Sequence, residues 1–297
     1  MLPLALALWG ATATATTTRQ DGGHDAVIDT TPSPAGSRTF YGLGGLSAGA
    51  STRMLLDYEP ERRAEVLDLL FSPGVGFSFQ ILKLELGGDC QSSWGTEASH
   101  AHSANDTDPH RFERGYEWWL AKEAVKRNPE ITLATLAWCA PPWITLGEAD
   151  GYYSPAGLQY HLDFYKAARD VHNLNISYVG VWNESPWSSS YIKSLRHALD
   201  STGFADTKII AADQASFDVW SAKPGSKTRL HADAAGGGMK TDKELYEAVG
   251  VIGLHHMHGR DTGPSSSGAT PDDVRQQSAR PLWASEDGLP HDSFPFP

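Results

Sequence analysis

The chain has 297 residues, ten of them Trp, and a formal net charge of −12. This length allows a large core, arranged either as one α/β barrel or as two smaller domains. The negative charge argues against nucleic acid or an anionic membrane surface as the main partner. The Trp content suits a protein that holds sugars against aromatic rings, although many of these side chains are expected in the core.

The first 18 residues are similar to a secretory signal peptide, with the apolar run Leu2–Trp9 followed by small residues. Residues 19–38 are rich in Thr, Ser, Gly and Pro, which predicts a flexible lead-in. No later run is long enough to span a bilayer. The sequons Asn105-Asp-Thr107 and Asn175-Ile-Ser177 agree with secretion. We therefore expect a glycoprotein that is secreted or delivered to a lysosome-like acidic vesicle.

From residue 39 to 297, strand-like apolar runs alternate with helical runs, which allows a doubly wound sheet or a (β/α)8 barrel. The expected strands are residues 40–45, 77–86, 131–138, 176–182, 208–212, 249–255 and 282–285, and the expected helices are 60–71, 114–127, 158–171, 191–199, 245–249 and 271–278. No nucleotide-binding fingerprint is present, and polar groups end several strands, so the barrel is favoured. Only eleven residues follow Glu286. The barrel is therefore expected to be incomplete after its seventh strand.

Two of the expected strands end in a carboxylate. The run Ile176–Trp182 leads into Asn183 and Glu184, and the run 282–285 leads into Glu286. Hydrolysis of a glycosidic bond needs two carboxyl groups across the bond, one as acid and one as nucleophile or base. We therefore predict Glu184 and Glu286 as a catalytic pair, with Asn183 binding the sugar 2-OH. Trp138 either stacks on the sugar or packs at the rim of the barrel.

Histidines gather after the sixth expected strand, as His255, His256 and His258. No neighbouring carboxylate or Cys pattern completes a metal site there, so we expect no metal and no other cofactor. A His that hydrogen-bonds and orients a nearby carboxylate is the favoured interpretation. The remaining His residues of interest lie in a polar loop and are expected at the surface: His100, His102 and His110.

The only two cysteines, Cys90 and Cys139, each follow an expected strand. If these strands are neighbours, the two thiols can form a disulfide at the rim of the sheet. Two separately buried thiols are an equally good interpretation.

Many stretches together resemble the galactosylceramidase family of retaining glycoside hydrolases. They run in order from about residue 40 to residue 287 and comprise 41–45 with 52–53, 81–89, 95–97 with 99–100, 114–120, 126–129, 178–184, 208–211, 251–253 and 282–287. The resemblance implies a retaining β-galactosidase that acts on galactosylated sphingolipids, with a lipid-presenting activator protein as a further partner.

The resemblance also implies roles for individual residues. Glu184 falls at the acid/base position of the family and Glu286 at the nucleophile position. Asn183 and Trp138 fall at positions that bind galactose. The other two implied substrate-binding residues are Ser93, which keeps the hydroxyl of a family Thr, and His255.

The chain also departs from the family pattern. His256 replaces a Tyr, Cys90 and Cys139 replace a Gly and a Ser, and a galactose-binding Arg of the family has no counterpart. Family members continue into the rest of the barrel, a β-sandwich and a lectin-like domain. Two alternatives therefore stay open. One is another retaining barrel glycosidase, such as a β-glucosidase or an endo-galactanase. The other is an inactive, truncated fragment that at most binds sugar.

Overall fold

A computed structural model describes residues 39–49, 52–90, 97–147, 151–221, 238–256, 274 and 276–287. The expected signal peptide and lead-in, as well as Ser93 and His258, lie outside these residues. The described strands and helices belong to one compact unit that begins at Gly42. No helix in the described part combines the length and the apolar character that crossing a bilayer requires.

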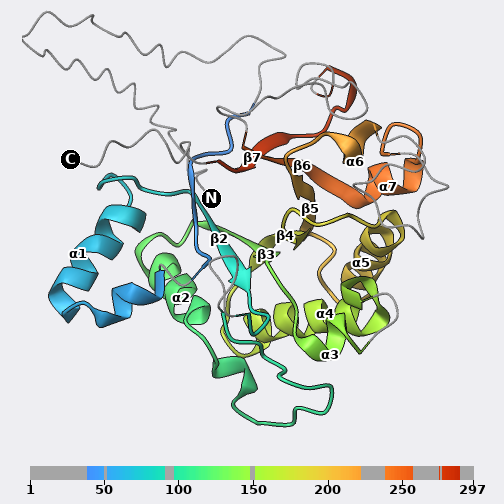
Figure 1. The fold of residues 1–297 in the computed structure, drawn as a ribbon. Coiled ribbons are helices and arrows are strands. Elements are labelled where there is room, and N and C mark those ends of the chain that lie inside the picture. Colours follow the sequence, from blue (N-terminus) through green and yellow to red (C-terminus); the bar gives the residue numbers. More distant parts are fainter. Residues whose placement is uncertain are drawn as a thin grey trace, which may run out of the picture. The chain divides into compact units, whose positions relative to one another are not determined.

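The described strands form one parallel sheet whose spatial order follows the sequence. Each strand pairs with the next along the chain, from β1 with β2 to β6 with β7. They are β1 (Gly44–Leu46), β2 (Ile81–Leu86), β3 (Thr132–Ala137), β4 (Ile176–Trp182), β5 (Lys208–Gln214), β6 (Val249–His255) and β7 (Leu282–Glu286). This order, in a sheet curled into a nearly closed barrel, confirms the predicted barrel with seven strands (Figure 1).

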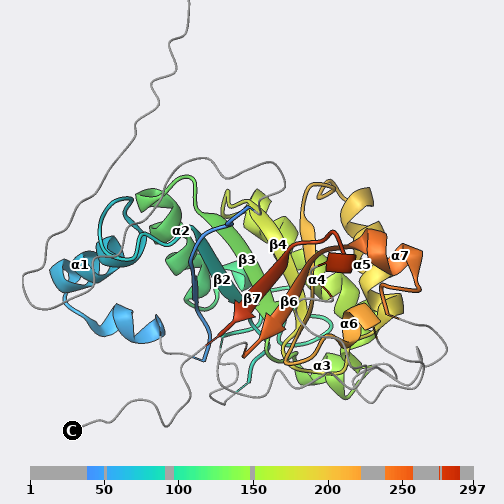
Figure 2. The ribbon, with the colours of Figure 1, turned by 90° about the horizontal axis from the view of Figure 1, so that it is seen from above.

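Helices connect the strands and lie outside them. They are α1 (Pro60–Phe71), α2 (Glu117–Arg127), α3 (Pro142–Thr145), α4 (Pro155–Asp170), α5 (Ser189–Ser201), α6 (Asp218–Ser221) and α7 (Lys243–Ala248), with the 3-10 segments η1 (Thr52–Asp57), η2 (Arg111–Glu113) and η3 (Gly151–Tyr153). Seen from above, α1 and α2 lie on one side of the strands, whereas α5 and α7 lie on the other (Figure 2). The short segments α3, α6 and the three 3-10 turns were not expected from the sequence.

Local signals explain where the two longest helices begin. Ser154 accepts a hydrogen bond from the backbone N–H of Gly157 at 3.2 Å, and Pro155 occupies the first turn, where its missing N–H costs nothing. Ser188 accepts from the N–H of Tyr191 in the same way at the start of α5. The expected strand at 77–86 begins only at Ile81, because Ser78 has a left-handed φ of 50° that interrupts an extended backbone.

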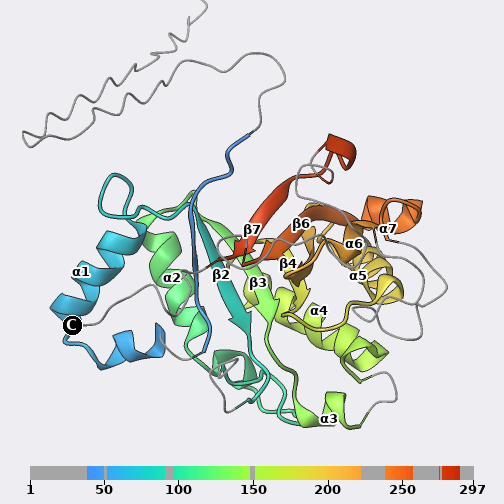
Figure 3. The same cartoon turned by 45° about the horizontal axis from the view of Figure 1, so that its top comes forward.

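The barrel interior contains a small apolar cluster to which β2 to β7 each contribute one side chain. Its members are Ile81, Ala134, Tyr178, Ile210, Val251 and Trp283. The rings of Tyr178 on β4 and Trp283 on β7 lie 4.6 Å apart, centroid to centroid. The carboxyl end of β7 also turns toward β2 (Figure 3). There, Lys83 Nζ donates to the Ser285 carbonyl oxygen at 3.1 Å. These contacts across the interior show how strongly the sheet curls.

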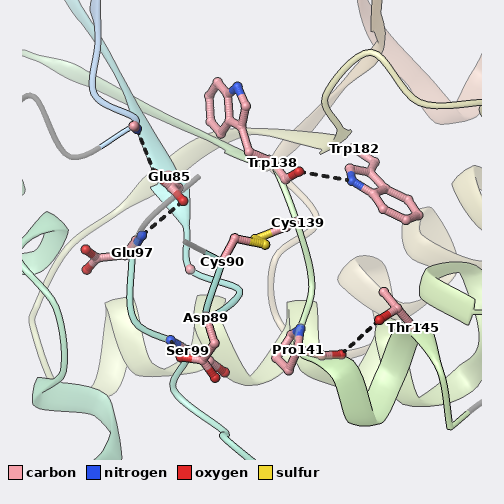
Figure 4. Close-up of a disulfide and its surroundings, with 12 residues drawn as sticks. Glu85, Asp89, Cys90, Glu97, Ser99, Trp138, Cys139, Pro141, Thr145 and Trp182 are labelled. Atoms are coloured by element: carbon pink, nitrogen blue, oxygen red, sulfur yellow. Dashed lines mark hydrogen bonds between the residues drawn. A yellow bond between two sulfur atoms is a disulfide. The ribbon is translucent and has the colours of Figure 1, made fainter. Parts of the chain in front are cut away.

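A disulfide joins Cys90, just beyond β2, to Cys139, just beyond β3, with the two Cα atoms 6.4 Å apart (Figure 4). The sequence left open whether these cysteines pair, because it could not show how closely the two strand ends approach. The bond closes a segment with a sequence separation of 49. It therefore links the segments that follow two neighbouring strands, β2 and β3, at the carboxyl rim of the sheet.

Replacing both cysteines by Ser should destabilise the protein by about 2–4 kcal/mol, because the disulfide removes loop-closure entropy from the unfolded chain. For a domain of this size the expected loss is roughly 5–10 °C in Tm. Thermal unfolding of the double variant checks this. Adding a reductant should lower the Tm of the parent protein and leave that of the double variant unchanged. Equal Tm values for parent and variant under oxidising conditions would contradict the prediction.

Candidate active site

Polar side chains converge at the carboxyl ends of four strands. Asn183 and Glu184 follow β4, Asp213 lies near the end of β5, His255 ends β6 and Glu286 ends β7. Because the strands are parallel, these ends meet at one rim of the barrel, which is where barrel enzymes assemble their active sites. Short distances join His255 to Glu184, Asp213 and Glu286.

The buried His255 ring lies among three carboxyl groups. Its Nδ1 lies 3.2 Å from Glu184 Oε1 and 3.8 Å from Glu286 Oε2. Its Nε2 lies 3.3 Å from Asp213 Oδ1. Burial disfavours the charged ring, but the hydrogen bonds to Asp213 and Glu184 outweigh burial and raise the pKa of His255. The arrangement therefore favours an imidazolium that donates from both nitrogens.

Lys83, on β2, neutralises the buried end of this network. Its Nζ donates to Asp213 Oδ1 at 2.9 Å, and both side chains are almost fully buried. Burial alone would raise the pKa of Asp213, but the Lys83 ammonium and the bond to His255 hold it below its usual range. Asp213 is therefore an anion inside the barrel, and it is balanced by a cation on each side.

Glu184 is the more accessible end of the network, with 31% of its side chain exposed. Its Oε1 lies 2.8 Å from His256 Nε2 as well as near His255. The hydrogen bond from His255, opposed in part by burial, lowers the pKa of Glu184. Without substrate, the lowered pKa therefore favours the ionised form of Glu184. Among the described residues, Glu184, His255 and His256 also form a group able to hold a metal ion.

The backbone leaves the extended conformation where these side chains project. Glu184, Asp213 and His256 have φ angles of 46°, 53° and 54°, in the left-handed region that residues other than Gly and Asn rarely adopt. Backbone hydrogen bonds hold these turns, from Glu184 N to Asp213 O at 3.0 Å and from His256 N to Glu286 O at 2.9 Å. Gly180 leaves room for the network, because a Cβ there would lie 2.7 Å from Asp213 Oδ2.

The structure brings together most of the residues predicted for the site. His255 lies beside the Glu184 carboxylate, as expected for a His that orients a carboxylate. Asn183 follows β4, and its buried Oδ1 has no hydrogen-bond partner among the described residues. Trp138 follows β3, half-buried, with Lys83 Nζ 5.7 Å from its ring centroid. Ser93 falls outside the described residues, so its predicted sugar contact stays a prediction.

Sequence reasoning missed Lys83 and Asp213 as parts of the site. The available signal was a lone Lys inside the apolar strand β2, a position that needs a buried counter-charge. The expectation for His100 was wrong. Its ring is buried and lies 4.0 Å from that of Tyr160, centroid to centroid. His102 and His110 are exposed, as expected.

A second group of buried carboxyls supports the chain beside the disulfide (Figure 4). Glu85, on β2, accepts from the backbone N–H of Glu97 at 3.1 Å. Glu97 Oε1 in turn accepts from the N–H groups of Tyr116 and Glu117 at 2.8 and 3.1 Å, which caps the start of α2. Mainly through burial, the pKa of Glu97 rises to about 8 and that of Glu117 rises well above its usual range. Glu97 is therefore protonated in acidic and neutral solution, and burial favours the protonated form of Glu117 as well.

The sequence model of glycosyl hydrolase family 59 matches residues 40–294. A galactocerebrosidase of Salmo salar is 41% identical over 84% of the chain, and one of Danio rerio is 42% identical over 84%. The chain spans about a third of the length of these curated relatives, 34% of each. The crystal structure of SrfJ from Salmonella typhimurium is 17% identical, with a TM-score of 0.64 over 87% of this chain and 59% of that one. It supports the fold alone.

Glu97 should make the protein less stable as the pH rises. Its folded pKa of about 8 exceeds the ordinary value of 4.5, so the folded state holds a proton that the unfolded state loses between these two pH values. Its stabilising contribution is complete below pH 4.5 and is lost as the pH approaches 8. Glu97→Gln keeps a neutral side chain, so Tm should fall less between pH 5 and pH 8 in the variant than in the parent.

The comparison between the two proteins is necessary because other groups titrate in the opposite sense. Burial lowers the pKa of His100 and His161 to about 3, so their contribution is lost as the pH falls below about 6.5. These groups are the same in both proteins and cancel in the difference. Parallel Tm curves for parent and Glu97→Gln would contradict the assignment.

Lys83 and Asp213 should be strongly coupled energetically. Lys83→Met leaves the Asp213 charge buried without its ammonium partner, which should cost about 3–5 kcal/mol in the free energy of unfolding. Adding Asp213→Asn removes that charge, so the double variant should be more stable than the sum of the single effects predicts. Denaturant unfolding of the four proteins measures this coupling. Additivity within about 0.5 kcal/mol would show that the pair does not stabilise the barrel interior.

Proposed function

Because the chain belongs to glycosyl hydrolase family 59, we propose that it is a retaining β-galactosidase acting on galactosylceramide-like glycolipids. The observation that carries the proposal is the His255 ring, whose Nδ1 lies within 3.2 Å of Glu184 and 3.8 Å of Glu286. It brings together the carboxyl groups that follow β4 and end β7, two strands that are not neighbours in the sheet. The galactose and lipid specificity is inferred from the relatives named galactocerebrosidase.

The spacing of the two carboxyls supports retention. Glu184 Oε1 and Glu286 Oε2 cannot be further apart than the sum of their distances from His255 Nδ1. For these two oxygens, the limit lies near the lower end of the range of about 6.5–9.5 Å in which inverting enzymes hold a water molecule between their carboxyls. It includes the separation of about 5–5.5 Å that lets one carboxylate attack the sugar directly.

In the proposed reaction the Glu286 carboxylate attacks the anomeric carbon while Glu184 gives its proton to the departing oxygen. The bond to the aglycone breaks, and a galactosyl ester forms on Glu286. Glu184, now ionised, removes a proton from a water molecule that attacks the same carbon and releases galactose. The lowered pKa of Glu184 suits this second step, whereas the first step is favoured in acidic solution, where more Glu184 is protonated.

The galactosyl group is bound by residues around this pair. The Asn183 amide would bind the 2-OH, an interaction that strengthens in the oxocarbenium-like transition state. Trp138 would offer its half-buried ring to the sugar, and Ser93 its hydroxyl. His255 lies between the two carboxyls and holds both in place. We assign no cofactor and no metal to the hydrolysis itself.

The lipid part of the substrate calls for a protein that presents it, and we include a lipid-presenting activator protein among the proposed partners. The protein would act after secretion or inside a lysosome-like vesicle.

A panel of aryl glycosides distinguishes this proposal from a β-glucosidase or an endo-galactanase. Among these substrates the β-galactoside should be cleaved with the highest kcat/KM.

Glu286→Gln should abolish turnover of an aryl β-galactoside, because an amide cannot form the galactosyl ester. Glu184→Gln should mainly slow substrates with poor leaving groups, since an activated phenol departs without an acid. Steady-state kinetics with two aryl β-galactosides of different leaving-group pKa check both expectations. The first sugar released by the parent protein should be the β-anomer when the reaction is followed by NMR.

Each outcome has a defined meaning. Full activity in Glu286→Gln would remove Glu286 from the mechanism. Release of the α-anomer would show inversion and contradict double displacement. Circular dichroism and Tm of both variants should match the parent, so that lost activity reports on chemistry and not on folding.

A further inference from the structure

The outer edge of the site holds three side chains whose donor atoms converge. Glu184, His255 and His256 each offer one donor atom, and the three donor atoms lie within 4.8 Å of one another. Glu184 Oε1 lies 3.2 Å from the His255 atom and 2.8 Å from the His256 atom. Ligands about 2.0–2.1 Å from a tetrahedral zinc ion stand about 3.3 Å apart. Small shifts of the three side chains would therefore let their donor atoms fill three of the four positions around a tetrahedral zinc ion.

The convergence depends on the backbone at His256. Successive residues of a strand point to opposite faces, so His255 and His256 would normally diverge. The φ of 54° at His256 ends the extended conformation at that residue. The ring of His256 consequently lies near that of His255, with centroids 5.9 Å apart and planes at 85°. The hydrogen bond from His256 N to Glu286 O fixes this turn.

A second layer of residues holds the buried ligand in a suitable orientation. His255 Nε2 faces Asp213 Oδ1 at 3.3 Å, and Asp213 is itself bound by Lys83. A carboxylate behind one ring nitrogen keeps the proton there and directs the other nitrogen toward a metal ion. His255 Nδ1 would release its proton on binding, and a divalent ion would take that place beside Glu184.

Access and donor type indicate the class of ion. The side chains of His256 and Glu184 are 44% and 31% exposed, so an ion can enter from solvent. Two imidazole nitrogens and one carboxylate oxygen suit zinc and other late transition metals, whereas Mg²⁺ and Ca²⁺ prefer shells of oxygen. Three protein ligands leave one position of a tetrahedral ion for water.

We propose that Glu184, His255 and His256 form a zinc-binding site that, when occupied, inhibits the protein. The inhibitory part rests on the proposed function, because Glu184 cannot hold the proton for the leaving oxygen while its carboxylate binds a zinc ion. The binding part is independent of it, because it depends only on the three donors and on Asp213.

Calorimetric titration of the whole chain with Zn²⁺, after removal of metals by a chelator, tests the binding. The parent should show one high-affinity site, and His256→Gln should weaken it at least tenfold. His110→Gln is the matched control, because His110 is an exposed His that also faces a carboxylate, that of Glu113. It should bind zinc as the parent does. Equal affinity in parent and His256→Gln would overturn the site.

Cobalt in place of zinc provides a test that needs no variant. Co²⁺ in a four-coordinate nitrogen and oxygen site should give intense visible absorption in the parent, and zinc should displace it. Only the weak spectrum of six-coordinate Co²⁺ would contradict the site. This measurement remains decisive if His256→Gln fails to fold.

Activity separates the two parts of the proposal. Zinc should inhibit hydrolysis of an aryl β-galactoside by the parent, a chelator should restore it, and His256→Gln should resist zinc at least tenfold better. High-affinity binding through His256 in a chain that hydrolyses no glycoside would support the site and contradict the proposed function. Hydrolysis without high-affinity zinc binding would overturn the site alone.

Discussion

The site depends on the buried ion pair between Lys83 and Asp213 and on the His255 ring that it holds. Lys83 on β2 contacts Asp213 on β5 across the barrel interior, and Asp213 contacts His255 on the neighbouring strand β6. A buried carboxylate without partners would be costly, so the pair constrains how the sheet curls. His255 contacts Asp213 on one side and lies beside Glu184 and Glu286 at the carboxyl rim on the other.

Two clusters of buried polar side chains therefore have different roles at the carboxyl rim of the barrel. In the charged network of Lys83, Asp213 and His255, the His255 ring lies beside the Glu184 and Glu286 carboxyls, whereas the Glu97 carboxyl secures the start of α2. Burial at the barrel rim raises the pKa of Glu97, whereas the neighbouring Lys83 and His255 hold the pKa of the buried Asp213 below its usual range. A protein stabilised by protonated carboxyls suits the acidic vesicle expected from the sequence.

The sequence predicted a barrel with seven strands and a carboxylate at the end of two of them, because an apolar run and the residues that follow it are local features. It could not predict contacts between residues far apart in the chain. Lys83 and Asp213 are 130 residues apart, and the sequence around Lys83 does not indicate which carboxylate pairs with it. The same limit hid the third metal donor, since the carboxylate beside His255 and His256 comes from β4. It also left the disulfide open and placed His100, wrongly, at the surface.

Trapping the galactosyl ester that we propose on Glu286 tests the double-displacement mechanism most directly. A 2-fluoro galactoside with a good leaving group should react with the parent protein and stop at the ester, because fluorine slows the second step. Mass spectrometry of the digested protein should find one fluorogalactosyl group on the peptide that contains Glu286. A label on another residue, or no label in a chain that hydrolyses the substrate, would contradict the account.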